Sequence, residues 1–299
     1  NTLSIERYIM NRIIQVLSIL FIFSITLSSG KDVFPVTLTD SSGREITVKS
    51  QPQRIVSLSP SITELLFYLG LSEKVVAVAG HCDYPPDALK KPKVGDVTLN
   101  IEKLLEFHPD LIIADNGLSD NLMSRSNSLG ANFLFLDSKD MDGIFNSIIL
   151  LGKATGETKV SLQLVNSLKE QVEDIRKKVP LNKPRVFVEI WPEPLMTVGA
   201  KSFINDIITL AGGVNIAGDM KKNDVQISSE WVVEKDPHVI IVSTPGTEDR
   251  VMSRKAWQRI SAIRKKQVYE IDPDIFVRPT PRIIMSIRQI SLWLKEEEF

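Results

Sequence analysis

The stretch Arg54-Ile-Val-Ser-Leu-Ser-Pro-Ser-Ile-Thr-Glu-Leu-Leu-Phe-Tyr-Leu-Gly70 predicts a strand, a tight turn and a helix within seventeen residues. Ile55 to Leu58 form a β-branched and aliphatic run, which is typical of a strand in a buried parallel sheet. Ser61 and Glu64 have the spacing of a capping box, so we expect the helix to begin at this pair. Gly70 stands where a left-handed residue would end the helix. Apolar residues recur on one helical face: Ile62, Leu65, Leu66 and Leu69.

The turn Ser59-Pro60-Ser61 lies where the strand ends. In open α/β sheets, ligands bind outside the carboxyl ends of the strands, so this turn is a candidate wall of a binding site. The alternative is that its serines only cap the helix.

Length, composition and net charge limit the classes of protein to which the chain can belong. The chain has 299 residues, of which 43% are hydrophobic and 24% are charged, so it is long enough for two lobes with separate cores. Its formal net charge of −1 gives no electrostatic case for nucleic acid or an anionic membrane surface as the partner.

The N-terminal segment 10–30 has the pattern of a secretory signal. Residues 13–27 form an apolar run that is preceded by Arg12 and followed by Ser28-Ser29-Gly30, and Met10 is a plausible start. An uncleaved membrane anchor is the alternative. The single cysteine, Cys82, lies far from this segment, so the sequence predicts no lipid-anchoring cysteine and no internal disulfide. We therefore expect an exported, periplasmic protein.

The segment that follows, 31–53, is predicted to be a β-hairpin arm around the turn Asp40-Ser-Ser-Gly43. From residue 54 to 157, strands alternate with helices, which indicates right-handed crossovers and a parallel sheet. The expected strands are 55–58, 75–79, 111–115 and 133–136, and the expected helices lie near 101–107, 118–129 and 142–153.

A long helix is expected to connect this lobe to a second one. Within 158–180, Val160, Leu164, Leu168, Val172, Ile175 and Val179 recur every three or four residues. A helix of about twenty residues is roughly 30 Å long, so it can span a small domain. Strand and helix alternation resumes over 181–299, with strands expected at 185–190, 239–243 and 268–271 and a final helix at 281–295.

A faint internal repeat supports two similar lobes. Residues 101–113 align with residues 229–241, and Arg54 to Leu58 align with Arg185 to Glu189. The predicted fold class is therefore α/β, with two parallel-sheet lobes joined by one long rigid helix and a ligand cleft between their strand ends.

Polar and aromatic side chains follow the predicted strands. In chain order they are Ser59; His81, Cys82, Asp83 and Tyr84; Asp115 and Asn116; Trp191 and Glu193; Thr244; and Asp272 to Arg278. This mixture suits a large polar organic ligand better than a compact catalytic triad.

Two other chemistries fit the residues poorly. A hydrolase would use Ser59 with His81 and Asp83, but the Gly-x-Ser-x-Gly elbow is missing and the latter two are too close in sequence to orient one another naturally. A bare-metal site needs several convergent ligands, whereas the chain has three histidines, and His108 and His238 precede strands away from the cleft. His81 could still be an axial ligand to a metal held in a macrocycle, or it could simply hydrogen-bond to water or ligand.

Glu102 and Glu230 are matched members of the internal repeat, each in the first turn of its predicted helix. A carboxylate there stabilises the helix dipole by roughly 0.3–1 kcal/mol. The alternative is that the pair docks onto a two-fold partner that bears arginines.

Five segments carry a family resemblance: Ser57 to Glu64, Asp83 to Pro86, Leu104 to Ile113, Ala211 to Ile216 and Asp274 to Arg282. Through them, residues 54–299 resemble the class III substrate-binding proteins of ABC importers, which include cobalamin, iron–siderophore and haem binders. The resemblance implies two α/β lobes joined by a long helix, with the ligand between them. It also implies that Glu102 and Glu230 engage arginines of a dimeric permease and that Asp274 and Arg278 hydrogen-bond the ligand.

The match to the cobalamin-binding type is incomplete. His81 stands where that type has tyrosine, and its cleft tryptophans are replaced near Val97, Asp115 and Asp224. We therefore expect a more polar pocket, in which Trp191 and Phe276 supply aromatic contact.

These observations predict a periplasmic solute-binding protein, not an enzyme, that captures a corrinoid and delivers it to an inner-membrane ABC permease dimer. An iron–siderophore or haem is the alternative cargo; an exported α/β hydrolase and a sensor or scaffold are the rival functions. No intrinsic cofactor is expected, the transported ligand being a cobalt corrinoid or iron chelate, and the protein is expected to be a monomer. The expected ligand contacts are His81, Tyr84, Trp191, Asp274, Phe276 and Arg278, and the expected docking pair is Glu102 and Glu230.

Overall fold

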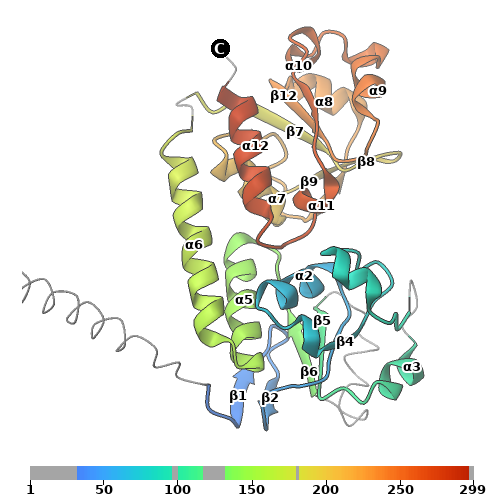
Figure 1. Ribbon diagram of the computed structural model, residues 1–299. Helices are drawn as coiled ribbons and strands as arrows, with labels where there is room; N and C mark the ends of the chain where they lie inside the picture. The colour runs from blue at the N-terminus through green and yellow to red at the C-terminus, as the bar shows by residue number, and fades with distance from the viewer. Residues whose placement is uncertain (1–31, 96–99, 117–131, 180–181, 296–299) are drawn as a thin grey trace, which may run out of the picture. The chain divides into compact units, whose positions relative to one another are not determined.

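A four-stranded parallel sheet forms the centre of the N-terminal lobe in the computed structural model (Figure 1). Its strands lie in the order β4-β3-β5-β6. Their bounds are β3 Ile55–Ser57, β4 Val75–Val78, β5 Leu111–Asp115 and β6 Asn132–Leu136. Every predicted strand of this lobe is present, because each is an apolar run buried on both faces.

The structure describes residues 32–95, 100–116, 132–179 and 182–295, and residues from Phe34 onward form one compact unit. The predicted signal, the predicted helix near 118–129 and Val97 lie outside the described residues. In the described part of the chain, no helix combines the length and the apolar character needed to cross a membrane.

The predicted hairpin arm is present. Strands β1 (Val36–Thr39) and β2 (Glu45–Val48) pair antiparallel, with Val36 opposite Val48. The turn is held by Asp40, whose carboxylate accepts a hydrogen bond from the backbone N–H of Ser42 at 2.9 Å.

Helices and short 3-10 turns pack around the first sheet. They are α2 Pro60–Tyr68, η1 Ser72–Lys74, η2 Pro86–Lys90, α3 Ile101–Glu106 and α5 Met141–Thr155. As predicted, the apolar face of α2 is buried and Gly70 has a positive φ of 75° beyond the helix end.

The predicted capping box is wrong. Ser59 is the N-cap of α2, and its Oγ accepts the backbone N–H of Ile62. The helix begins two residues earlier than the spacing of Ser61 and Glu64 suggests, because Pro60 is suited to a first helical position, where its missing N–H costs nothing. Glu64 is therefore free for another role, described below.

Helix α6 (Thr158–Arg176) is the predicted long helix. Figure 1 shows it running beside α5 and then beside the C-terminal helix α12 (Ile283–Lys295), and it packs against both. Its buried stripe differs at the start from the predicted one, since Val160 is 38% exposed and Val165 is buried instead.

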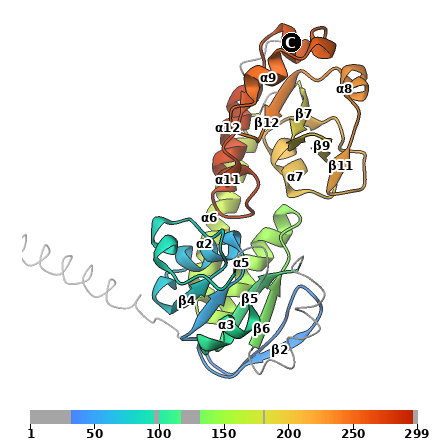
Figure 2. The same ribbon diagram turned by 90° about the vertical axis from the view of Figure 1, so that its right-hand side faces the viewer.

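The C-terminal lobe contains a parallel sheet in the order β10-β7-β12-β13. Its strands are β7 Arg185–Glu189, β10 Val214–Asn215, β12 Val239–Val242 and β13 Val268–Glu270. A small antiparallel sheet lies in the same lobe (Figure 2), with strands β8 Trp191–Pro192, β9 Leu195–Val198 and β11 Asp224–Gln226. The remaining elements are α7 Phe203–Leu210, α8 Ser229–Lys235, α9 Glu248–Met252, η3 Lys255–Trp257, α10 Ser261–Arg264 and α11 Pro273–Phe276.

The internal repeat is visible as matching hydrogen bonds in the two lobes. The guanidinium of Arg54 donates to the carbonyl of Phe107 at 2.7 and 2.9 Å, at the end of α3. The guanidinium of Arg185 donates to the carbonyl of Lys235 at 3.1 Å, at the end of α8. An arginine at the start of each first strand thus binds the carbonyl end of the corresponding helix.

His238 belongs to this repeat. Its Nδ1 accepts the backbone N–H of Arg185 at 3.2 Å, just as Asp110 accepts the backbone N–H of Arg54 at 3.0 Å. The side chain is therefore part of the scaffold, in agreement with its predicted place away from the cleft.

Candidate functional site

A cavity of about 420 Å³ is lined by both lobes at the carboxyl ends of their strands. The N-terminal lobe contributes the end of β5, the residues after β6 and the start of α2. The C-terminal lobe contributes β11 and the loop after α11. The lining residues that matter below are Ser61, Asp115, Asp137, Lys139, Asp224 and Val277.

The Ser59 to Ser61 turn is both a helix cap and a wall of this cavity. The hydroxyls of Ser59 and Ser61 lie 2.8 Å apart, and Ser61 lines the cavity. Ser59 also hydrogen-bonds to the carboxylate of Asp115. The turn therefore caps the helix through Ser59 and lines the cavity through Ser61.

Asp115 is an acidic residue in the N-terminal wall of this cavity. Burial raises the pKa of its carboxyl; the hydrogen bond from Ser59 opposes this shift, while the nearby charge of Asp137 adds to it. Asp137 itself forms an ion pair with Lys139 at 2.7 Å. Among the described residues, Asp115 has no such cationic partner.

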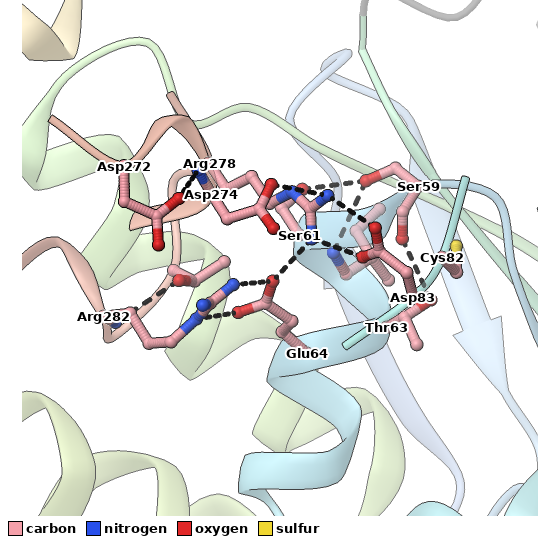
Figure 3. Close-up of polar contacts among 12 residues, drawn as sticks. Ser59, Ser61, Thr63, Glu64, Cys82, Asp83, Asp272, Asp274, Arg278 and Arg282 are labelled. Atoms are coloured by element: carbon pink, nitrogen blue, oxygen red, sulfur yellow. Dashed lines mark hydrogen bonds and ion pairs between the residues drawn. The ribbon is translucent and has the colours of Figure 1, made fainter. Parts of the chain in front are cut away.

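A group of five charged residues joins the lobes beside this cavity, and we call it the interlobe ion-pair cluster (Figure 3). Its members are Glu64 and Asp83 of the N-terminal lobe and Asp274, Arg278 and Arg282 of the C-terminal lobe. These two groups of residues are about two hundred positions apart in the sequence, so the cluster is purely tertiary.

Glu64 is the centre of the cluster. Its carboxylate is fully buried and accepts two hydrogen bonds from Arg282, at 2.8 and 2.5 Å. Arg278 adds a third at 3.3 Å. Burial acts to lower the pKa of Arg282, but the hydrogen bond and charge of Glu64 outweigh burial and raise it.

Arg278 also binds two acids nearer to solvent. Its guanidinium lies 2.7 Å from Asp83 and 2.9 Å from Asp274. The hydrogen bond from Arg278 lowers the pKa of Asp83 against the opposing effect of burial. The predicted ligand contacts Asp274 and Arg278 thus lie together at the lobe junction, with each other as partners.

The predicted aromatic contacts have different environments. Tyr84 is 37% exposed, and the Arg282 guanidinium lies 3.8 Å from its ring centroid. Trp191 is 57% exposed, and its Nε1 donates to the carbonyl of Glu193 at 2.9 Å. Phe276, however, is fully buried in the hydrophobic core. Its ring therefore packs the fold, which does not support the prediction that it contacts a ligand.

His81 is exposed and lies two residues before Asp83, which pairs with Arg278. In the described residues, no three His, Cys, Asp or Glu side chains are grouped so that they could hold a metal ion.

Glu102 and Glu230 occupy equivalent places. Each is exposed and lies in the first turn of a short helix, α3 or α8. Each helix has a side-chain cap, from Asn100 and Ser228 respectively. The helix N-termini explain the two carboxylates locally, while their exposure leaves both available to a partner.

The sequence analysis missed the Glu64 contacts. No signal in the sequence pointed to them, because Glu64 lies off the apolar face predicted for α2 and its burial is seen only in the structure. A charged residue is almost never fully buried unless it is paired. The pairing with Arg278 and Arg282 could not be found from spacing, since it depends on how the lobes meet.

Comparison with known proteins gives consistent matches. The profile of the family described as "Periplasmic binding protein" matches residues 55–275. The vitamin B12-binding protein of Vibrio cholerae is 34% identical, over 81% of this chain and 89% of its own length. An uncharacterized ABC transporter substrate-binding lipoprotein, YvrC of Bacillus subtilis, is 33% identical, over 87% of this chain and 85% of its own length.

A solved structure agrees with these sequence matches. The crystal structure of the periplasmic vitamin B12-binding protein of Vibrio cholerae superposes with a TM-score of 0.74 at 32% identity, covering 82% of this chain and 97% of that chain. The predicted two-lobe α/β fold is confirmed. The prediction of a binding protein in preference to a hydrolase is confirmed as well, because the family and these relatives are substrate-binding proteins.

Proposed function

Since the chain belongs to the periplasmic binding protein family, we propose that it is the solute-binding component of an ABC importer and that it captures a corrinoid between its lobes. The observation that carries the proposal is the cavity formed by strand ends of both lobes. Its volume of about 420 Å³ lies within the usual range of ligand pockets, roughly 300–1,000 Å³. Relatives named as vitamin B12-binding proteins support the choice of cargo.

The chemistry of the cavity suits the periphery of a corrinoid, which carries amide side chains. Asp115 and Asp224 offer carboxylate oxygens that can accept hydrogen bonds from amide N–H groups. Trp191, which follows the lining residue Ile190 in the chain, offers an exposed aromatic face. Tyr84, His81, Asp274 and Arg278 complete the proposed set of contacts.

Release and capture require the lobes to part slightly, because a corrin ring with its side chains is larger than the cavity. The ion pair between Arg278 and Asp83 can break when the lobes part, since the Asp83 side chain is 49% exposed. The buried Glu64 contacts and helix α6 keep the movement small. Affinity then comes mainly from walls that are already in place.

Absorbance titration tests this proposal. The protein is titrated with cyanocobalamin, dicyanocobinamide, haemin and a ferric hydroxamate siderophore, and the bound ligand is recovered and analysed. The expected result is tight binding of a corrinoid that is recovered unchanged. Binding of only haemin or the siderophore would contradict the corrinoid cargo, and recovery of an altered ligand would contradict the carrier function. A change in the cobalt band that is lost in His81→Ala would indicate axial ligation by His81.

Delivery of the cargo involves an inner-membrane permease dimer in this proposal, with Glu102 and Glu230 as the docking pair and the signal segment 10–30 directing export. The double reversal Glu102→Arg/Glu230→Arg should abolish uptake while ligand affinity is unchanged, because both residues lie on exposed helix starts outside the cavity lining. Uptake by a reporter strain and titration of the purified variant measure the two effects. Unimpaired uptake would contradict the docking role.

A further inference from the structure

The cavity between the lobes is acidic. Within the part of the chain that the structure describes, its negatively charged lining residues are Asp115, Asp137 and Asp224, and its positively charged lining residue is Lys139. Asp137 and Lys139 neutralise one another through their 2.7 Å ion pair. Asp115 and Asp224 are left to set the sign of the field in the cavity.

These two carboxylates come from different lobes. Asp115 ends β5 of the N-terminal lobe, and Asp224 begins β11 of the C-terminal lobe. The backbone of Asp224 is fixed opposite Val198, which also lines the cavity. A ligand lying between the lobes therefore meets negative charge from both walls.

Arg278, a cation next to lining residues in the chain, is already engaged. Val277 and Pro279 line the cavity, and Arg278 lies between them in the chain. The Arg278 guanidinium is bound by Asp83, Asp274 and Glu64. An anionic ligand would have to compete with three carboxylates for this arginine.

We propose that the cleft selects its metal chelate by the charge of the chelate's periphery: it accepts peripheral amides and rejects free carboxylates. This inference rests on the proposed function. An amide N–H can donate to Asp115 or Asp224, whereas a carboxylate in the same place is repelled and leaves both aspartates without a donor. Corrinoids with amidated side chains belong to the accepted class. Haem, with two free carboxylates, and corrinoid precursors that have not been amidated belong to the rejected class.

The test uses two ligands that share one macrocycle. Dicyanocobinamide carries amides around the corrin ring, and dicyanocobyrinic acid carries carboxylates at the same positions. Excess cyanide keeps both axial positions occupied, so His81 cannot act as a ligand to cobalt. We expect the amide form to bind at least about a hundredfold more tightly to the unaltered protein, which corresponds to two tenfold steps in Kd.

Neutralising both walls should remove much of this preference. In Asp115→Asn/Asp224→Asn, the ratio of the two affinities should fall by about tenfold or more, mostly through tighter binding of the carboxylate form. High salt should also narrow the ratio for the unaltered protein, because screening weakens the repulsion. Asp87→Asn is the matched control, since Asp87 is exposed, pairs with Lys90 and does not line the cavity. If the double variant does not fold, the single variant Asp224→Asn, at an exposed position, replaces it in this test.

The outcomes separate the two proposals. Tight but equal binding of both corrinoids would overturn the charge selection and leave the carrier function in place. Tight binding of haemin with no corrinoid binding would overturn the selection and the corrinoid cargo together. A preference for amides that is identical in the neutralised variant would overturn the assignment to Asp115 and Asp224.

Discussion

Glu64 and Asp115 are both carboxylates of the N-terminal lobe at the junction with its partner lobe, but their surroundings differ. Glu64 is fully buried and receives hydrogen bonds from Arg278 and Arg282 of the other lobe. Asp115 is half-buried and is held by the hydroxyl of Ser59. The first carboxylate fastens the lobes together. The second can still hydrogen-bond to a ligand in the cavity. Its burial costs stability, and we attribute this cost to its role in ligand binding.

The largest effect is expected for Glu64→Gln. Loss of the charge leaves Arg282 buried without an anion, and breaking a buried ion pair in this way destabilises a protein by about 3–5 kcal/mol. Urea unfolding measures the change in the free energy of unfolding. Glu102→Gln, at an exposed helix start, is the control and should change this free energy by at most about 1 kcal/mol. An unfolding midpoint for Glu64→Gln equal to that of the control would show that the interlobe ion-pair cluster does not hold the lobes.

A smaller effect of opposite sign is expected for Asp115→Asn. Because burial raises the pKa of Asp115 in the folded protein, its contribution to stability is greatest in acid and is lost as the pH rises through that raised pKa. Asparagine does not ionise, so the variant does not lose this stability as the pH rises. It should be more stable than the unaltered protein at pH 7 and similar to it below pH 3.8, the ordinary pKa of aspartate. Thermal unfolding across this pH range is the measurement. A variant that is less stable at pH 7 would contradict the contrast with Glu64.

The smallest effect is expected for Asp83→Asn, at the exposed edge of the interlobe ion-pair cluster. Weakening the contact with Arg278 should raise the population of opened molecules and speed ligand association by about threefold, with little change in stability. Stopped-flow absorbance with dicyanocobinamide measures this rate. The unaltered protein should show the same acceleration in acid. Because the pKa of Asp83 is lowered in the folded protein, the contribution of Asp83 to the stability of the closed form is present above the ordinary value of 3.8. This contribution is lost as the pH falls through the folded-state pKa. An unchanged rate in Asp83→Asn would indicate that this contact does not limit opening.

The contrast between the two carboxylates also shows what the sequence can predict. The strands were predictable because each is a short apolar run. Asp115 was assigned to a strand end because it directly follows the apolar run of β5. The matched places of Glu102 and Glu230 followed from the internal repeat.

The remaining features depend on contacts between distant parts of the chain. Glu64 was assigned to a helix cap because its local spacing from Ser61 fits one, and only the approach of the second lobe reveals its arginine partners. Phe276 was predicted to face the ligand because it lies beside Asp274 and Arg278 in the sequence, but in the short helix α11 its side chain points to the core. Periodicity could not decide this over four residues.

The central claim is that the ligand lies between the lobes, and the position of cobalt tests it most directly. Crystals of the protein grown with dicyanocobinamide would give an anomalous difference peak for the metal. The expected position is between the wall that carries Asp115 and the wall that carries Asp224. A peak on an outer face of either lobe would contradict the claim.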